Sequence, residues 1–293
     1  LKILLLGSNG QLGNCLVDEL SKSEHELIVT NRFQIDIANT QLTKEKITDI
    51  CPDIVINASA YNAVDKAEKE PELANIINGY AIKNIAGICK KINSKFIHVS
   101  TDYVFDGKSK IPYTELSTVN PLGIYGKSKL LGEKAIINSG CDYIIIRTSW
   151  VFSEYGNNFL KTMIKLASKE KELSIVADQY GCPTYARDLA IAIIATLSKV
   201  ETNDCEWGIY NFSGNSGCSW YEFAEYIFDV AKEMDMKVPK ALNKISMDKY
   251  NNLANRPKYS ILNCSKFSNN FNVQSSDWKI AIKHILRKIE INY

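Results

Sequence analysis

The first half of the chain alternates short, β-rich apolar runs with amphipathic stretches of helical period. The apolar runs predict strands at 2–6, 26–30, 53–57, 95–100 and 142–147. The amphipathic stretches predict helices from the turn after residue 6 to about 21, at 41–50, at about 64–91 and near 121–138. Strand–helix units of this length need crossover connections, which place the strands in parallel. We therefore expect an α/β fold with a doubly wound parallel sheet covered by helices on both faces.

The regular alternation weakens after about residue 150. Helices are expected at 158–168, 185–198, 219–234 and 278–289, separated by short strands and by loops rich in Asn, Ser and Pro. We interpret residues 1–150 as one domain and residues 151–293 as a smaller lobe over the carboxyl ends of the sheet, where ligands of open α/β sheets bind. Whether the 185–198 helix returns to the first domain is left open.

The composition is that of an ordinary globular protein and argues against two classes of partner. The chain has 293 residues, 45% of them hydrophobic, and its 35 Lys+Arg against 33 Asp+Glu give a net charge of +2. Proteins that bind nucleic acid or anionic membranes by bulk electrostatics usually carry a basic excess or a basic tract, and neither is present. The longest apolar stretches, such as 3–6, fall far short of the about 18 residues that a membrane-spanning helix needs. We expect a cytoplasmic protein that binds neither nucleic acid nor membrane.

The eight cysteines are scattered singly, with no C-x-x-C pair and no histidine at metal-ligand spacing. A catalytic cysteine would need a partnered base, and no motif links His25, His98 or His284 to a cysteine. We interpret the cysteines as reduced thiols and expect no metal site.

A glycine-rich turn follows the first expected strand and opens the first helix. Its residues, in a G-x-x-G-x-x-G spacing, include Gly7, Asn9, Gly10, Gln11, Leu12 and Gly13. Glycines there permit a tight turn and close approach of a pyrophosphate, while the free N–H groups of the helix start bind the anion. The motif predicts a dinucleotide site of Rossmann type. The alternative is a glycine-rich turn without a ligand, which the strand–turn–helix context disfavours.

The end of the second strand bears on the choice between NADH and NADPH. A dinucleotide site usually carries an acidic residue there for the adenosine ribose hydroxyls, and its absence or a nearby Arg admits a 2′-phosphate. This chain has Asn31 and Arg32 at that place. The pattern favours NADPH over NADH, with Arg32 as the contact to the 2′-phosphate. The equally weighted alternative is that Arg32 is only a solvated cation in the loop. Asp36 and Ile37, a few residues on, are expected against the adenine edge.

Tyr125 and Lys129 are four residues apart, so on a helix they share a face about one turn from each other. A Lys ammonium near a phenol favours the phenolate and lowers its pKa, which makes Tyr a usable proton donor near neutral pH. Lys129 can also hold a nicotinamide ribose, and Thr101, at the end of the fourth strand, can hydrogen-bond a carbonyl oxygen. Tyr-x-x-x-Lys pairs are common on helix surfaces, so this one gains meaning only beside the glycine turn and Thr101.

These three elements together resemble the extended short-chain dehydrogenase/reductases. The strings between them narrow the resemblance to one family of that superfamily, the dTDP-4-dehydrorhamnose reductases. The strings are NASAYNAVDKAE at 57–68, STDYVFDG at 100–107, RTSWV at 147–151, NNF at 157–159, DQYGCPT at 178–184 and RP at 256–257. The similarity extends from Gly7 to Arg256, which is nearly the whole chain.

The resemblance implies a reaction and a set of roles. The reaction is reduction of the 4-keto group of dTDP-4-dehydro-β-L-rhamnose by NAD(P)H to give dTDP-L-rhamnose. By matching position, Tyr125 is the general acid, Lys129 its pKa modulator and ribose anchor, and Thr101 the donor to the carbonyl. The positions expected to contact the nucleotide-sugar substrate are Thr101, Asp102, Tyr103, Trp150, Asn158 and Arg256. Those expected to line the cofactor after the third strand are Ala58, Ala60, Tyr61 and Asn62.

Some positions depart from the family pattern. Tyr61-Asn62 stands where relatives often have His-Thr, and Cys15 stands where some relatives have an acidic ligand of a metal that pairs two chains. Metal-dependent dimerisation is therefore not supported, and a homodimer stays open. Two other functions remain: reduction or epimerisation of another nucleotide sugar, and a non-catalytic regulatory subunit of the same fold. The intact catalytic trio favours an enzyme.

For three features, packing or solvation is the alternative to a functional role. Trp150, directly after a strand, is also suited to core packing between sheet and lobe. Asp65, Lys66 and Glu68 also fit a solvated charge cluster at a helix start. The aromatic residues of 220–227 are interpreted as the core stripe of a helix rather than as part of a cofactor site.

Overall fold

The central sheet is parallel, and its inner strands are buried on both faces. The computed structural model describes residues 1–250 and 253–290, and over these residues a six-stranded sheet has the order β10-β5-β4-β3-β1-β2. The strands are β1 (Lys2–Leu6), β2 (Glu26–Thr30), β3 (Ile54–Asn57), β4 (Lys95–Thr101), β5 (Tyr143–Thr148) and β10 (Gly208–Asn211). Leu4 and Leu5, neighbours whose side chains point to opposite faces, are both fully buried. The sequence therefore shows continuous apolar runs, and the expected α/β class is confirmed.

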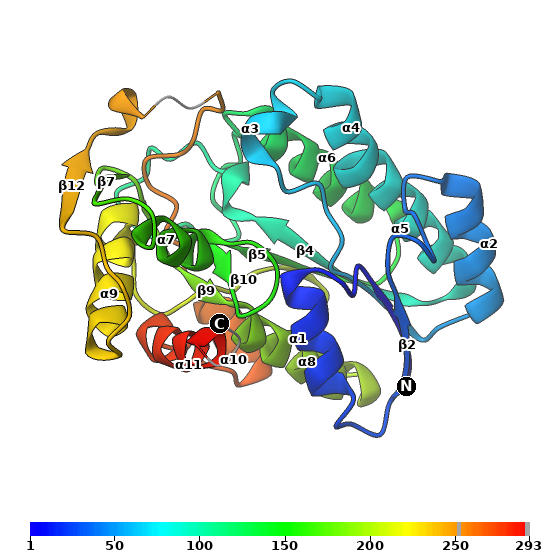
Figure 1. Cartoon of the computed structure of the whole chain (residues 1–293). Helices are drawn as coiled ribbons and strands as arrows, with labels where there is room; N and C mark the ends of the chain where they lie inside the picture. Colours follow the sequence, from blue (N-terminus) through cyan, green and yellow to red (C-terminus); the bar gives the residue numbers. More distant parts are fainter. Residues whose placement is uncertain (251–252, 291–293) are drawn as a thin grey trace.

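Helices cover both faces of this sheet (Figure 1). One face carries α1 (Gln11–Leu20), α8 (Ala186–Glu201) and α10 (Ser265–Phe271), which share a core with alternate strand residues such as Leu5 and Ile97. The other face carries α2 (Thr40–Ile50), α5 (Ala81–Ile92) and α6 (Ile124–Ser139), which share a second core with Leu4 and Val55. Both cores use the period of two that sends successive strand residues to opposite sides.

The helical region expected at about 64–91 is divided into shorter elements. They are α3 (Val64–Ala67), α4 (Pro71–Asn75), a π-helical turn at Ile76–Tyr80, and α5. Pro71 stands in the first turn of α4, where a missing N–H removes no helical hydrogen bond. Asn78, buried in the π-helical turn, accepts from Tyr61 N at 2.8 Å and donates to Tyr61 O at 3.0 Å. The irregular turn thus fixes the chain that follows β3.

The chain after residue 150 contributes both to the sheet and to a separate core. That core is built on α7 (Phe159–Ala167), α9 (Trp220–Glu233), α11 (Trp278–Glu290) and the parallel pair β7 (Glu172–Val176) and β12 (Ala241–Ile245). Two further short pairs join β6 (Val151–Phe152) to β9 (Thr184–Tyr185) and β8 (Tyr180–Gly181) to β11 (Cys218–Ser219). The division at residue 150 stays a prediction, whereas α8, α10 and β10 pack with the sheet. None of the helices described here has both the length and the apolar character to cross a membrane.

A largely buried arginine fastens α1 to the second half of the chain. Arg187, in the first turn of α8, donates to Asp18 Oδ2 at 2.7 Å and to Glu154 Oε1 at 3.0 Å, and it also pairs with Glu19. Burial alone would raise the pKa of Glu154, but hydrogen bonds from Lys288 and Arg187 lower it to about 2. The anchored α1 holds the glycine turn at its start in a fixed position.

Candidate active site

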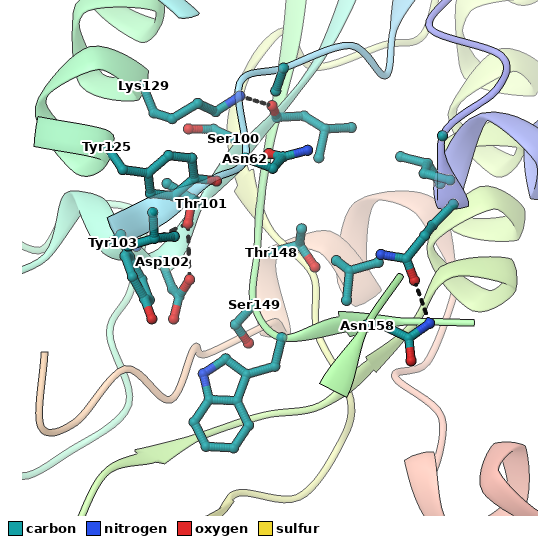
Figure 2. A pocket seen from close by; sticks show the side chains of 18 of the residues that line it. Asn62, Ser100, Thr101, Asp102, Tyr103, Tyr125, Lys129, Thr148, Ser149 and Asn158 are labelled. Carbon is teal, nitrogen blue, oxygen red and sulfur yellow. Dashed lines mark hydrogen bonds between the residues drawn. The ribbon is translucent and has the colours of Figure 1, made fainter. Parts of the chain in front are cut away.

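The carboxyl ends of four neighbouring strands lie along one edge of the sheet and create a cleft. In the sheet register Leu6 lies beside Asn57, and Thr101 lies beside Thr148. The loops after β1, β3, β4 and β5 therefore meet at one edge, where open α/β sheets bind ligands. They line a cleft of about 440 Å³, to which Trp220 and Arg256 contribute from the second half of the chain. Figure 2 shows this cleft, with Tyr125, Thr101 and Asp102 on one side and Asn158 on the other.

Most of the predicted site residues line the cleft. They are Gly10, Gln11, Leu12, Ala58, Ala60, Asn62, Thr101, Asp102, Tyr103, Tyr125, Lys129, Trp150, Asn158 and Arg256. The predicted residues that lie outside its lining are Gly7, Asn9, Gly13, Asn31, Arg32, Asp36, Ile37 and Tyr61. Further lining residues are Ser59, Val64, Val99, Ser100, Thr148, Ser149, Val151, Asn157, Leu189 and Trp220. Eight of these further residues lie within two positions of a predicted one in sequence, whereas Leu189 and Trp220 come from α8 and α9 without a local signal.

The segment after β2 lies away from the cleft. Asn31 Oδ1 accepts from Phe33 N at 2.9 Å, which closes a tight turn. The Arg32 side chain is 74% exposed and pairs with Asp36 at 3.4 Å, a solvent-screened contact that leaves its guanidinium accessible to an anion. The Ile37 side chain is 5% exposed and packs in the core that contains Leu4. Only the backbone of Ile37 could therefore contact an adenine.

The glycine turn leaves room for an anion at the start of α1. Gly7 has a φ of +85°, and a Cβ there would lie 2.7 Å from Ser59 N, so a side chain is excluded on both grounds. Gly10 caps α1 in an extended conformation, and the backbone N–H groups of the first turn have no side-chain cap. Free N–H groups at a helix start are suited to phosphate oxygens. The turn thus fits the pyrophosphate of a dinucleotide.

Tyr125 and Lys129 enter the cleft from the start of α6. The helix begins at Ile124, whose N–H donates to Glu68 Oε1 at 2.8 Å. Lys129, one turn further on, is 2% exposed and donates through Nζ to Val99 O at 2.7 Å (Figure 2). The spacing of four therefore brings both side chains to the end of β4, as expected from helical periodicity.

The protonation of this pair differs from the expectation. Burial raises the pKa of Tyr125 to about 12, although its hydrogen bond with Thr101 acts in the lowering direction. Burial lowers the pKa of Lys129 to about 8, and the nearby Glu133 carboxylate partly opposes that shift. The expected lowering of the Tyr125 pKa is therefore not found in this structure, because loss of solvation raises that pKa and the neighbouring Asp102 carboxylate acts in the same direction. The role of Lys129 as its pKa modulator stays a prediction. A high pKa keeps the phenol protonated at neutral pH, which suits a proton donor.

A turn at 102–104 places three adjacent residues of the cleft. Thr101 Oγ1 accepts from Tyr103 N at 3.2 Å and donates to Asp102 Oδ1 at 3.0 Å. Asp102 is 2% exposed, and burial raises its pKa to about 7 against the lowering effect of the Ser260 and Thr101 hydroxyls. The Tyr103 ring meets the Tyr125 ring edge-on at 5.7 Å. This turn therefore holds a hydroxyl, a carboxyl and an aromatic ring around the Tyr125 phenol.

Two stacked indoles form part of the cleft wall. Trp150 has a φ of +48°, a left-handed conformation that costs energy for a bulky residue. Its ring stacks on Trp220 at 3.5 Å between centroids and 9° between planes. The interpretation of 220–227 as a core stripe is confirmed for Phe223 and Ile227, which are fully buried. Trp220 packs against the same core and also lines the cleft, which the interpretation did not anticipate. A helix-start aromatic cannot be assigned to a core or a cleft from periodicity alone.

Asn158 and Gln11 connect the two sides of the cleft. Asn158 caps α7 by accepting from Lys161 N at 3.0 Å, and its Nδ2 donates to Gln11 Oε1 at 2.9 Å (Figure 2). Ser153 Oγ also donates to Gln11 Oε1, at 3.2 Å. The glycine turn and the start of α7 are thus joined through one amide oxygen.

Arg256 and the 65–68 segment form a second connection across the cleft. Arg256 Nη2 donates to Asp65 Oδ2 at 2.5 Å, and Asp65 Oδ1 accepts from Ala254 N at 3.1 Å. The solvated-cluster alternative is therefore wrong for Asp65, and also for Glu68, whose carboxylate caps α6. It holds for Lys66, whose exposed ammonium pairs with Glu70 at 3.3 Å. Arg256 Nη1 is buried and has no hydrogen-bond partner among the described residues.

Within residues 1–250 and 253–290, no cluster of His, Cys, Asp or Glu is arranged to hold a metal ion. The expectation of a metal-free site stays a prediction, as does the question of a homodimer. The chemistry that the cleft offers directly is proton donation, hydrogen bonding to a carbonyl oxygen and binding of phosphate groups.

Comparison with known proteins extends the similarity over the whole chain. The family model described as "RmlD substrate binding domain" matches residues 1–291. A dTDP-4-dehydrorhamnose reductase of Aggregatibacter actinomycetemcomitans is 40% identical over 288 residues, covering 97% of this chain and 98% of the relative. A solved dTDP-4-dehydrorhamnose reductase from Clostridium acetobutylicum is 35% identical, with a TM-score of 0.91 and coverage of 99% of this chain and 100% of that one. Another, from Bacillus anthracis and in complex with NADP, is 36% identical, with a TM-score of 0.89 and coverage of 98% of each chain.

Proposed function

The chain belongs to the family described as the RmlD substrate binding domain, and we propose that it reduces dTDP-4-dehydrorhamnose with NADPH or NADH. The reaction converts the 4-keto group of the sugar to a hydroxyl and yields dTDP-L-rhamnose. One observation carries the proposal. A chain with full-length similarity to such reductases brings Tyr125, Lys129 and Thr101 to one cleft beside an anion-binding glycine turn.

The residues present fit a dinucleotide that runs from the β1–α1 turn toward Tyr125. Gly10 and the first turn of α1 would hold the pyrophosphate, and Ala58, Ala60 and Asn62 line the path after β3. Such a cofactor, when bound, supplies the hydride that reduces the carbonyl carbon. We propose NADPH as the preferred form, because the exposed Arg32 guanidinium replaces the usual acidic residue and can reach a 2′-phosphate.

Tyr125 donates the proton that the reduced oxygen needs. Negative charge develops on the sugar O4 as the carbonyl is reduced, and the neutral phenol of Tyr125 gives its proton to that oxygen. The Thr101 hydroxyl, which now donates to Asp102, can turn to donate to the same oxygen. Positioned acid catalysis of this kind contributes about 10²–10⁴-fold. Lys129 holds the ribose side of the site and adds positive charge when protonated.

The nucleotide sugar is recognised by polar atoms that have unused hydrogen-bonding capacity in this structure and by an aromatic face that lines the cleft. Asp102 Oδ2 is buried without a hydrogen-bond partner among the described residues, so it can accept from a sugar hydroxyl. Arg256 Nη1, which lacks a partner in the part of the chain that the structure describes, suits a phosphate oxygen of the diphosphate. The Trp150 indole offers an apolar face to the sugar ring, and Asn158 borders the same space.

The direct test is loss of reduced-nicotinamide absorbance with dTDP-4-dehydrorhamnose generated in situ, run separately with NADPH and NADH. We expect turnover with both cofactors and a lower KM for NADPH. A folded protein that binds cofactor but turns over none of this substrate would overturn the substrate assignment. A folded protein that binds neither cofactor would indicate a regulatory subunit instead.

Tyr125→Phe tests the proton donor within the same assay. We expect turnover to fall by about 10²–10⁴-fold with cofactor affinity unchanged, because the phenol proton is lost and the ring is kept. Tyr80→Phe, at a residue 56% exposed on the π-helical turn, is the matched control and should retain full activity. Wild-type turnover in a folded Tyr125→Phe enzyme would remove Tyr125 from this role.

A further inference from the structure

A completely buried histidine lies next to Lys129, outside the lining of the cleft. His98 is 0% exposed in β4, and its Nε2 is 3.5 Å from Lys129 Nζ. Lys129 Nζ also donates to the carbonyl of the neighbouring Val99 at 2.7 Å. None of the roles in the proposed function involves His98, so its contact with Lys129 needs its own explanation.

The orientation of the Asn57 amide follows from its neighbour Ser59. The Ser59 backbone N–H can only donate, and it lies 3.1 Å from Asn57 Oδ1. The Ser59 hydroxyl donates to the same oxygen at 2.5 Å. These two bonds identify that atom as the oxygen, so the amide nitrogen is the atom on the other side. Asn57 Nδ2 therefore faces His98 Nδ1, at 3.0 Å, across the register of β3 and β4.

The Asn57 amide in turn determines where the imidazole carries its proton. An amide nitrogen only donates, so His98 Nδ1 must accept. Burial keeps the His98 ring neutral by lowering its pKa well below the ordinary value, and the Lys129 charge acts in the same direction. A neutral ring that accepts at Nδ1 carries its proton on Nε2. The Nε2–H bond consequently points at Lys129 Nζ.

The two protonation states of Lys129 fit this neighbour unequally. An ammonium has three N–H donors and no lone pair, so it meets the Nε2–H of His98 as donor against donor. A neutral amine has a lone pair that can accept from Nε2–H while one of its own hydrogens still binds Val99 O. We infer that His98 is a positioning residue of the reaction: its Nε2–H, set by Asn57 and Ser59, disfavours the ammonium form of Lys129.

The other charged groups near Lys129 do not supply this effect. Glu133, one turn further along α6, favours the ammonium. Its carboxylate is held by Arg147 of β5 at 2.7 and 3.0 Å and by Ser100 of β4 at 2.6 Å. Tyr125 and Asp102 share the cleft with Lys129, and an ionised Asp102 would also favour a cation there. The pKa of Lys129, lowered to about 8 by its burial, is consistent with an environment that resists the charge.

The inference rests on the proposed function, since it concerns the lysine assigned to the catalytic set. Each turnover takes one proton from the protein. A lysine that exchanges its proton near neutral pH can return that proton from solvent, whereas a permanently charged one cannot. His98, through Asn57 and Ser59, would therefore tune the pH range of the reductase without touching substrate or cofactor.

Nitrogen-15 NMR of the full chain labelled at histidine tests the tautomer directly and needs no substrate. We expect His98 to be neutral with its proton on Nε2, from about pH 6 to about pH 9. The His98 signals are identified by their loss in His98→Gln, because His25 and His284 are the other two histidines. A proton on Nδ1, or a doubly protonated ring, would overturn the inference.

The pH profile of turnover tests the consequence for Lys129. Glutamine can turn its Oε1 to accept from the ammonium, so His98→Gln should move the alkaline limb of kcat to higher pH by about one unit, a tenfold change in the proton equilibrium. His284→Gln, at an exposed residue of α11, should leave the limb in place. A His98→Gln enzyme with lower kcat but an unmoved limb would show a merely structural role and overturn the inference. If His98→Gln does not fold, the nitrogen-15 NMR measurement of the His98 tautomer in the wild-type protein tests the inference by itself. An inactive wild-type enzyme would refute the proposed function while the tautomer measurement still tests this inference.

Discussion

Replacing Gly181 with Ala should weaken substrate binding by displacing Trp150. Gly181 lies in β8 directly against the indole, and a Cβ there would sit 2.5 Å from Cε2 and 2.7 Å from Nε1 of Trp150. Both separations are shorter than real Cβ atoms make, so the ring or the strand must shift. A shift of the ring disturbs its 3.5 Å stack on Trp220.

The size of the effect follows from two terms. Inserting a methyl group into a filled contact costs about 1–3 kcal/mol of folding free energy. At roughly 2–4 °C of melting temperature per kcal/mol, Gly181→Ala should melt several degrees below wild type. Loss of one aromatic stack amounts to about 0.5–1.5 kcal/mol. Since about 1.4 kcal/mol is tenfold in affinity, we expect KM for the nucleotide sugar to rise roughly 2- to 12-fold.

The assay is steady-state reduction with each substrate varied in turn, together with a thermal melt. KM for NADPH should stay at the wild-type value, because the glycine turn that would hold the cofactor lies at the far end of the cleft from β8. Gly87→Ala is the matched control. Its Cβ would meet nothing within 4 Å on α5, so the same substitution should stabilise the protein by about 0.5–1 kcal/mol and leave kinetics unchanged.

Either of two results would refute this reasoning. A Gly181→Ala enzyme with wild-type KM and melting temperature would mean that the position of the Trp150 indole does not require a glycine at residue 181. An equal rise in KM for both substrates would mean that the substitution disturbs the whole cleft rather than the indole wall.

Three further predictions concern charged groups. Arg32→Ala should raise KM for NADPH about tenfold and leave KM for NADH unchanged; equal changes for both cofactors in the same assay would contradict the role of Arg32. Glu133→Gln leaves Arg147 buried without its paired carboxylate and should lower the free energy of unfolding by about 3–5 kcal/mol, measured by urea denaturation; unchanged stability would contradict it. The pKa of Asp102, raised to about 7, means that the folded protein holds this proton more tightly than the unfolded chain, so stability falls as pH rises from about 4 to about 7. Asp102→Asn should flatten that decline in the free energy of unfolding, measured by urea denaturation at about pH 5 and about pH 8. An equal change between the two pH values in wild type and Asp102→Asn would contradict the raised pKa of the buried carboxyl.

The parallel sheet could be predicted because its signal is local. Strands at 2–6 and 26–30 have the expected bounds. The inner strand β1 is a continuous apolar run because both of its faces are buried, and the edge strand β2 carries the β-branched residues typical of strands. The pairing of β7 with β12 could not be predicted. The two strands are separated in sequence by two helices, and the alternating burial of residues 172–176 does not indicate which strand they pair with. The division of 64–91 was signalled by Pro71, but the π-helical turn depends on tertiary contacts of Asn78.

The candidate site was predictable where spacing determines geometry and unpredictable where burial determines chemistry. Tyr125 and Lys129 share a helix face because they are four residues apart, whatever surrounds them. The direction of their pKa shifts depends on desolvation, which arises only when distant segments close over them. Trp220 and His98 show the same limit. The first becomes a cleft residue through its stack on Trp150, and the second acquires a partner through the register of β3 and β4.

The position of β10 has a consequence for the protein while it is being synthesised. This strand covers one edge of the sheet and comes from residues 208–211, long after β5 has left the ribosome. Until then the edge of β5 has unpaired N–H and C=O groups along a run that contains Ile144 and Ile146, an arrangement that invites pairing with another nascent chain. Asn211 then completes the edge by bonding to Tyr113 O at 2.9 Å. A nascent chain stopped between β5 and residue 208 therefore carries an open sheet edge and is exposed to aggregation.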